Sequence, residues 1–298
     1  MTVPATAGDP ADSIAGPATA RHLLRRAVAP RPDGEVCAVE PGATEGWEYL
    51  SFHVYRLEPG DTVRRAADDR ERLVLLLEGK AQVTAGGQDL GILGSRETVF
   101  DGRPATSVLV EPGAGVDIRA ETHSLIAIAA APGGSVRRTA VIDAGDVLVE
   151  SRGTGNTHRV VHHLLPPSAE AGRLIAFEVF TPQGNWSSYP PHKHDTEDPP
   201  RESRLEELYY YRFERPQGFA FARVYTKDGR LDESMTPGDG DLVLVPEGYH
   251  PVGVPAGYDC WYLNVMAGPT RQWRFTLDPD HAWLMNWGNP QPTEDPAR

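Results

Sequence analysis

Apolar residues occur along this chain in short runs that are separated by glycine- and proline-containing turns. In the first half these runs fall at residues 48–57, 73–77, 80–84, 98–100, 107–110 and 125–130. Turn residues such as Pro59-Gly60-Asp61 and Gly86-Gly87 stand between them. Short runs at roughly ten-residue spacing predict the β-strands of a sandwich or a small barrel.

The same pattern of short apolar runs separated by turns begins again after residues 131–134, which read Ala-Pro-Gly-Gly. The second set of strand candidates comprises residues 173–181, 189–194, 207–213, 219–226, 241–246 and 258–266. An aliphatic run next to a glycine occurs in both halves, at 73–79 and 240–246, which is a sign of internal duplication.

This organisation predicts an all-β chain with two tandem units, residues 21–145 and 146–288. We expect a flexible tail at residues 1–20 and a disordered, proline-rich tail at 289–298. Residues 22–29 are predicted either as a short helix or as the approach to a strand.

The composition narrows the classes of partner. Among 298 residues there are 30 glycines and 27 prolines, which suits many short strands better than long helices. The formal net charge of -13 argues against a nucleic acid or an anionic membrane as partner, because both require a basic surface. A small anionic substrate is compatible with this charge if a few arginines line the site.

The two cysteines, Cys37 and Cys260, are far apart in the sequence. We predict two free thiols in a reducing compartment, with a single disulfide as the alternative. Residues 1–17 are small and polar and have no apolar core of a signal peptide. No run approaches the roughly 18 apolar residues of a membrane span. These features together predict a cytoplasmic protein.

Three segments of the second half offer side chains that bind metals. His192 and His194 are one residue apart, so on an extended strand they point to the same side. Glu207 leads into an aromatic strand, and His250 follows the turn at Gly248. Three histidines and one carboxylate suit a divalent transition metal that keeps room for a substrate.

Longer motifs surround these residues. They read FEVFTP at 177–182, GNWSSYPPHKHD at 184–195, EELYYYR at 206–212 and YLNVMAGP at 262–269. These motifs resemble the 5-deoxy-glucuronate isomerase family of the cupin superfamily, which acts in bacterial myo-inositol catabolism. The similarity is densest from residue 173 to 283 and looser in the first half.

The resemblance implies a bicupin, that is, two tandem cupin-type β-barrels with the metal site in the second barrel. It implies conversion of 5-deoxy-D-glucuronate to 5-dehydro-2-deoxy-D-gluconate, an aldose–ketose isomerisation of a small anionic sugar acid. Carried over position by position, the metal ligands fall on His192, His194, Glu207 and His250. The first half has no His-x-His, so we expect a barrel without metal that serves packing or assembly.

The spacing departs from the general cupin pattern at two places. Twelve residues separate His194 from Glu207, where three or four are usual, so residues 195–206 are expected to form an acidic loop. Only one residue separates Gly248 from His250, where two are usual.

Glu206 is an alternative ligand to Glu207. We favour Glu207 because period-two spacing places it on the same side as Tyr209 and Tyr211. These two tyrosines are candidates for proton transfer or for holding a substrate hydroxyl, with a place in the barrel core as the alternative. Glu178 lies inside an otherwise apolar strand, either as a base in the cavity or as a solvated residue on the outer face.

Arginine is the residue that grips a carboxylate through two parallel hydrogen bonds. Arg223 and Arg159 are the candidates for this role, and an ordinary structural role is the alternative for each. Lys193 is expected on the outside, opposite the two histidines that flank it.

Three functions stay open on the sequence alone: the metal-dependent isomerase, an Fe(II) cupin dioxygenase, and a non-enzymatic bicupin that binds sugar acids. The ligand set does not choose strongly between zinc, manganese, iron and nickel, and zinc is the default. Cupins associate through strand edges, so a homo-oligomer is a further expectation.

Overall fold

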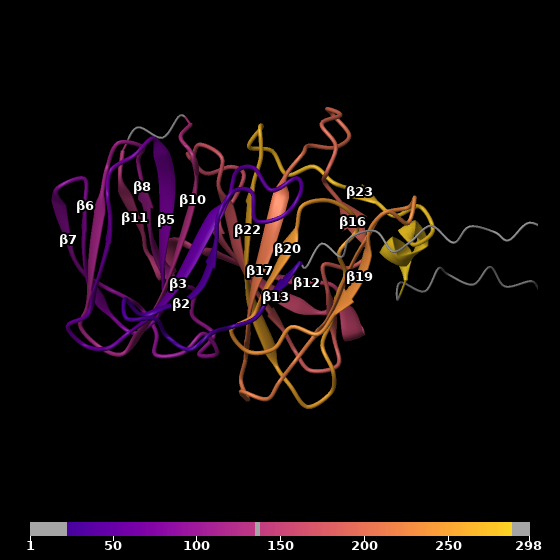
Figure 1. The fold of residues 1–298 in the computed structure, drawn as a ribbon. Helices are drawn as coiled ribbons and strands as arrows, with labels where there is room; N and C mark the ends of the chain where they lie inside the picture. The colour runs from indigo at the N-terminus through magenta and orange to yellow at the C-terminus, as the bar shows by residue number, and fades with distance from the viewer. Residues whose placement is uncertain (1–22, 135–137, 288–298) are drawn as a thin grey trace, which may run out of the picture.

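The computed structural model describes residues 23–134 and 138–287, and these form two β-barrels (Figure 1). Both predicted tails, 1–20 and 289–298, lie outside the described residues. The only helices of the described part are three short 3-10 turns, η1 (Ala144–Asp146), η2 (Gly155–Thr157) and η3 (Ala282–Asn286). None of them has the length and apolar character needed to cross a membrane. The all-β prediction is confirmed.

The first barrel pairs a six-stranded sheet with a four-stranded sheet. The larger sheet has the order β11 (Ala140–Ile142), β8 (Thr106–Val110), β5 (Arg70–Glu78), β10 (Ser124–Pro132), β3 (Ser51–Leu57) and β2 (Glu35–Val39). The smaller sheet has the order β4 (Thr62–Arg65), β9 (Val116–Ala120), β6 (Ala81–Ala85) and β7 (Gln88–Leu93). Aliphatic side chains from both sheets, Val74 and Val83 among them, fill the interior as one cluster.

The second barrel has the same design. Its larger sheet has the order β1 (Leu24–Arg25), β20 (Leu242–Val245), β17 (Glu206–Phe213), β22 (Cys260–Ala267), β14 (Ile175–Thr181), β13 (Arg159–Leu165) and β12 (Leu148–Arg152). The smaller sheet has the order β15 (Trp186–Ser187), β21 (Val252–Gly253), β18 (Phe221–Tyr225) and β19 (Asp232–Met235), and β16 (His192–Lys193) pairs with β23 (Thr276–Leu277).

The two large sheets contact each other, so each is buried on both faces. In β5, Val74 and Leu76 point into the first barrel, while Leu73 and Leu75 belong to the cluster shared with the second half. A strand buried on both faces has an unbroken apolar run, which explains why residues 73–77 show no alternation. This contact also places one face of β17 against the first barrel and the other inside the second.

Two predicted segments differ from the structure in detail, and a third had two alternatives. Residues 98–100 form a turn before Asp101-Gly102 and not a strand. The strand predicted at 189–194 shortens to His192–Lys193, because the two preceding prolines lack the N–H that a ladder needs. Of the segment 22–29, the structure describes residues 23–29, and Leu24–Arg25 form the strand β1, which pairs with β20 of the second barrel. Cys37 and Cys260 are both buried and free.

Candidate metal centre

The three predicted histidines come from two segments that the fold brings together. His192 lies on β16 opposite Leu277, and His194 follows two residues later. His250 comes from the turn between β20 and β21, and its side chain is buried like that of His194. One ring nitrogen from each of the three histidines lies within 4.8 Å of the others.

Glu207 joins this group from β17. Its Oε2 atom lies 2.8 Å from Nε2 of His194 and 3.0 Å from Nε2 of His250. Asn264, on the neighbouring strand β22, donates its side-chain amide to the other oxygen, Oε1. Glu206 points the opposite way, towards backbone N–H groups of the first barrel. Glu207, and not Glu206, therefore lies with the histidines.

The backbone fixes which nitrogen each imidazole presents to the others. Nδ1 of His192 donates to the Pro190 carbonyl at 3.1 Å, and Nδ1 of His194 donates to the Leu205 carbonyl at 2.9 Å. Nδ1 of His250 donates to a carbonyl in the same way, at 2.9 Å. A protonated Nδ1 leaves the Nε2 lone pair free, which is the usual arrangement of metal-binding histidines.

The arrangement fits a divalent cation. Neighbouring ligand atoms that each lie about 2.1 Å from a metal are about 3.0–3.4 Å apart, close to the spacing between Glu207 and the two histidine nitrogens. Nε2 of His250 is buried and lies 3.0 Å from Oε2 of Glu207, but it does not have hydrogen-bond geometry with any described residue. A buried nitrogen of this kind, beside a carboxylate and two further imidazoles, is the donor set that a transition metal prefers.

The pKa shifts within the group differ. Burial acts to lower the pKa of His194, but the hydrogen bond with Glu207 and its charge outweigh burial and raise that pKa. Burial, together with the neighbouring His250 and His194, lowers the pKa of His192 to about 3. Burial acts to raise the pKa of Glu207, but His250 and His194 outweigh it and hold that pKa well below its usual value. His192 is therefore a neutral imidazole and Glu207 a carboxylate anion, the forms that bind metals.

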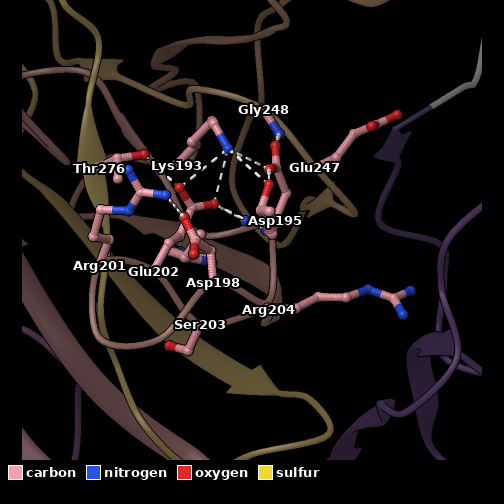
Figure 2. Close-up of polar contacts among 12 residues, drawn as sticks. Lys193, Asp195, Asp198, Arg201, Glu202, Ser203, Arg204, Glu247, Gly248 and Thr276 are labelled. Carbon is pink, nitrogen blue, oxygen red and sulfur yellow. Dashed lines mark hydrogen bonds and ion pairs between the residues drawn. The ribbon is translucent and has the colours of Figure 1, made fainter.

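Gly248 shapes the turn that presents His250. Its φ is 90°, and a Cβ there would lie 2.6 Å from the Tyr225 carbonyl oxygen, so glycine is required. The Gly248 N–H donates to Asp195 at 2.8 Å, and Asp195 also lies 2.5 Å from Nζ of Lys193 (Figure 2). Asp195 thus ties the His-x-His segment to the turn of the third histidine.

A pocket opens beside these residues in the second barrel. Its apolar wall is made by Val161, Phe177, Val179 and Trp273. Its polar lining consists of Arg152, Arg159, Ser188, His192, Glu207, Tyr209, Tyr262 and Asn264. Metal-binding groups and two guanidinium groups therefore face one small space.

Arg159 is the more enclosed of the two arginines. Its guanidinium donates to the carbonyls of Thr157, at 2.9 Å, and Tyr189, at 3.4 Å. It forms no salt bridge with any residue that the structure describes, and burial lowers its pKa. Arg152, in contrast, lies 2.9 Å from Glu150. A half-buried guanidinium with no carboxylate partner among the described residues suits an anionic ligand.

With this geometry in hand, comparison with known proteins identifies the family. A family model described as KduI/IolB matches residues 23–284. The chain belongs to the KduI/IolB family.

Its relatives agree with this assignment. A 5-deoxy-glucuronate isomerase from Geobacillus kaustophilus (strain HTA426) is 46% identical over 264 residues, which cover 89% of this chain and 95% of the relative. Another, from Bacillus subtilis (strain 168), is 43% identical over 238 residues, 80% of this chain and 88% of the relative. With relatives of this kind over most of its length, the KduI/IolB chain is an isomerase.

Solved structures show the same fold. An IolB-like protein from Salmonella typhimurium aligns with a TM-score of 0.85 at 42% identity and covers 88% of this chain and 99% of that one. Oxalate decarboxylase from Bacillus subtilis aligns with a TM-score of 0.59 at 13% identity, over 87% of this chain and 80% of that one. The second likeness shows the fold alone, and it agrees with the predicted tandem cupin-type barrels.

The structure places the other predicted site residues of this KduI/IolB chain in different surroundings. Tyr209 lines the pocket, with its hydroxyl 2.9 Å from that of Ser188. Tyr211 lies deeper in the barrel, where its hydroxyl is buried without a hydrogen bond in the described part of the chain. Arg223 is outside the pocket, exposed and paired with Asp232 at 2.8 Å.

Glu178 is also outside the pocket, for a reason of strand geometry. Its neighbours Phe177 and Val179 line the pocket, so on β14 the side chain of Glu178 points to the opposite face. There it pairs with Arg96 of the first barrel and lies 3.0 Å from Nδ1 of His162. It is neither in the cavity nor solvated, because the first barrel covers that face.

Sequence reasoning missed several polar residues of the site. Asn264 lies on a strand that is buried throughout, so no alternation marks its side chain as facing the pocket. Ser188 adopts a φ of 50°, a left-handed conformation that is uncommon outside glycine and that sequence does not reveal. Lys193 was expected outside but is mostly enclosed by the carboxylates of Asp195 and Glu202.

Proposed function

We propose that this chain converts 5-deoxy-D-glucuronate to 5-dehydro-2-deoxy-D-gluconate in inositol catabolism. A divalent metal, zinc by default, would be held by His192, His194, Glu207 and His250. The observation that carries the proposal is that two members of this set, His192 and Glu207, line one pocket with Arg159. The guanidinium of Arg159 lacks a carboxylate partner among the described residues. The names of the relatives support the choice of substrate.

The reaction moves a carbonyl from C1 to C2 of the sugar acid. A bound divalent cation supplies stabilisation of the negative charge that develops on the sugar oxygens. Arg159 would receive the substrate carboxylate and so set the distance from that end to the reacting carbons. Phe177, Val179 and Trp273 give the pocket one apolar wall, which excludes water from the space beside it.

Hydrogen transfer is constrained by the bases that the pocket offers. Burial, followed by the charge of Glu207, raises the pKa of Tyr209 well above its usual value, and burial also raises that of Tyr262. Both are therefore neutral phenols and poor bases. The other titratable groups of the described lining are two arginines and two members of the ligand set, His192 and Glu207.

We therefore expect the hydrogen on C2 to move to C1 with its electron pair, so that C2 is oxidised and C1 reduced. The proton on the C2 oxygen would pass to the C1 oxygen through the adjacent hydroxyls of Tyr209 and Ser188. Unlabelled substrate turned over in deuterium oxide should then give product with no carbon-bound deuterium, as measured by NMR and mass spectrometry. One carbon-bound deuterium per product molecule would show proton abstraction by a base instead.

The proposed activity is tested by metal removal and reconstitution. Chelator-treated protein should lose turnover of 5-deoxy-glucuronate. Zinc, manganese, iron(II) and nickel are then added back one at a time, and the native metal should restore turnover. Carbonyl transfer should proceed equally well without oxygen, which excludes a dioxygenase. The related substrate 5-keto-4-deoxyuronate should turn over more slowly. Binding of the sugar acid without turnover by the metal-loaded protein would contradict the isomerase proposal.

Three further expectations belong to this proposal. We place the boundary between the two barrels near residue 145. The strand β1 precedes this boundary in the sequence but pairs with β20 of the second barrel. The two free, buried cysteines suit a cytoplasmic protein. A homo-oligomer is proposed on the strand-edge association expected of cupins.

A further inference from the structure

The start of β17 links the barrel without histidine ligands to the candidate metal centre. Along the segment 204–207, successive residues alternately contact the first barrel and the candidate metal centre. Arg204 and Glu206 contact the first barrel, while Leu205 and Glu207 contact the histidines. We infer that the first barrel is a positioning element for the metal centre and holds His194 and Glu207 in place through this segment. The inference rests on the proposed metal-binding function.

On the first-barrel side, Glu206 is clamped by backbone groups. Its carboxylate accepts the N–H of Glu48 at 2.7 Å and of Tyr49 at 2.8 Å, and it also accepts the N–H of Leu50. Glu206 is 3% exposed, so these bonds are sheltered from water. The loop is itself fixed, because Arg70 donates to the Tyr49 carbonyl at 2.7 Å. A buried carboxylate with three N–H donors fixes the direction in which β17 starts.

On the site side, the same segment holds one ligand by its backbone and supplies another. The Leu205 N–H donates to the His194 carbonyl at 2.8 Å, and the Leu205 carbonyl accepts from Nδ1 of His194 at 2.9 Å. Glu207 follows directly and lies 2.8 Å from Nε2 of His194. The side chain of Arg204 extends towards the first barrel (Figure 2). Its guanidinium lies 2.9 Å from Glu48.

A second buried carboxylate, that of Glu71, joins the two barrels in the same way, but within the described residues it contacts none of the proposed metal ligands. Glu71 lies opposite Ala131 on β10, just as Glu206 lies opposite Ala267 on β22. Glu71 is fully buried, and it accepts N–H groups across the same contact between barrels, at 2.6 Å from Gly172 and 2.7 Å from Leu174.

The two carboxylates, Glu206 and Glu71, differ in the residue that follows each of them in the sequence. Where Glu207 follows Glu206, Arg72 follows Glu71. Arg72 is buried, donates to the Ala66 carbonyl at 2.9 Å and pairs with Asp68. A guanidinium therefore occupies the position that corresponds to the proposed ligand. Glu71 clamps the two barrels without touching a metal centre, which makes it the control for Glu206.

The experiment compares Glu206→Gln with Glu71→Gln in the full chain loaded with zinc. Each change removes charge and acceptor capacity from one of the two clamps, so both variants should unfold at a lower temperature than the unaltered protein. Zinc affinity, measured by competition with a colorimetric chelator, should fall about tenfold or more in Glu206→Gln only. In Glu71→Gln it should stay within about twofold of the unaltered protein. If either variant fails to fold, Glu206→Asp and Glu71→Asp form a milder pair with the same expected order.

The outcomes separate this inference from the function on which it rests. Equal loss of zinc affinity in both variants would show that only global stability matters, and unchanged affinity in Glu206→Gln would show that the clamp does not position the ligands. Either result overturns the inference and leaves the metal centre standing. Failure of the unaltered protein to bind any divalent metal would overturn both.

Discussion

Replacement of His192 by alanine should abolish stoichiometric metal binding and lower kcat/KM at least about 1,000-fold, equivalent to about 4 kcal/mol of transition-state stabilisation. The reason is geometric. His192, His194 and His250 present ring nitrogens within 4.8 Å of one another, and removal of one leaves an incomplete set around the cation. The measurements are metal content of the purified variant and turnover of 5-deoxy-glucuronate.

The change should leave the fold intact, because His192 lies at the edge of a two-residue strand and outside the hydrophobic core. Circular dichroism and the unfolding temperature check this. His53→Ala is the control: His53 lies in the first barrel, where it contacts Glu35 and Glu40, and its loss should change neither metal content nor turnover. A metal-free His192→Ala protein with full activity would refute the metal-assisted mechanism.

Part of the candidate cluster, namely His192, His194 and Glu207, could be predicted to gather from the sequence, because period-two geometry works on short extended segments. His192 and His194 had to share a side, and the choice of Glu207 over Glu206 followed from its spacing to Tyr209. The structure places Glu207 with the histidines and turns Glu206 to the other face of β17. Local periodicity was sufficient here, since it needs no knowledge of what covers each face.

The same reasoning could not place Glu178 or Arg223, because their positions depend on distant parts of the chain. Whether Glu178 meets a cavity or water depends on the first barrel, whose Arg96 lies 82 residues earlier in the sequence. Arg223 lies on β18, whose outer face is exposed, and it pairs there with Asp232. Alternation shows that two faces exist, but only tertiary packing decides which face lines the pocket.

Arg159→Met should raise the KM for the uronate about 100-fold, with a much smaller effect on kcat. Methionine keeps most of the side-chain volume but removes the charge. The loss of charge-assisted hydrogen bonds to a carboxylate in a buried pocket costs about 3 kcal/mol. The guanidinium is held ready by the carbonyls of Thr157 and Tyr189, so little reorganisation accompanies substrate binding.

Two comparisons make this result specific for carboxylate recognition. Arg223→Met removes an exposed arginine outside the pocket and should leave KM within about twofold, since exposed ion pairs contribute little. A neutral analogue, 5-deoxy-D-glucose, should turn over poorly in the unaltered enzyme and equally poorly in Arg159→Met, because it has no carboxylate to lose. An equal loss on the acid and the neutral sugar would instead assign Arg159 to the shape of the pocket. The carboxylate would then have to be bound by Arg152, the other arginine of the lining.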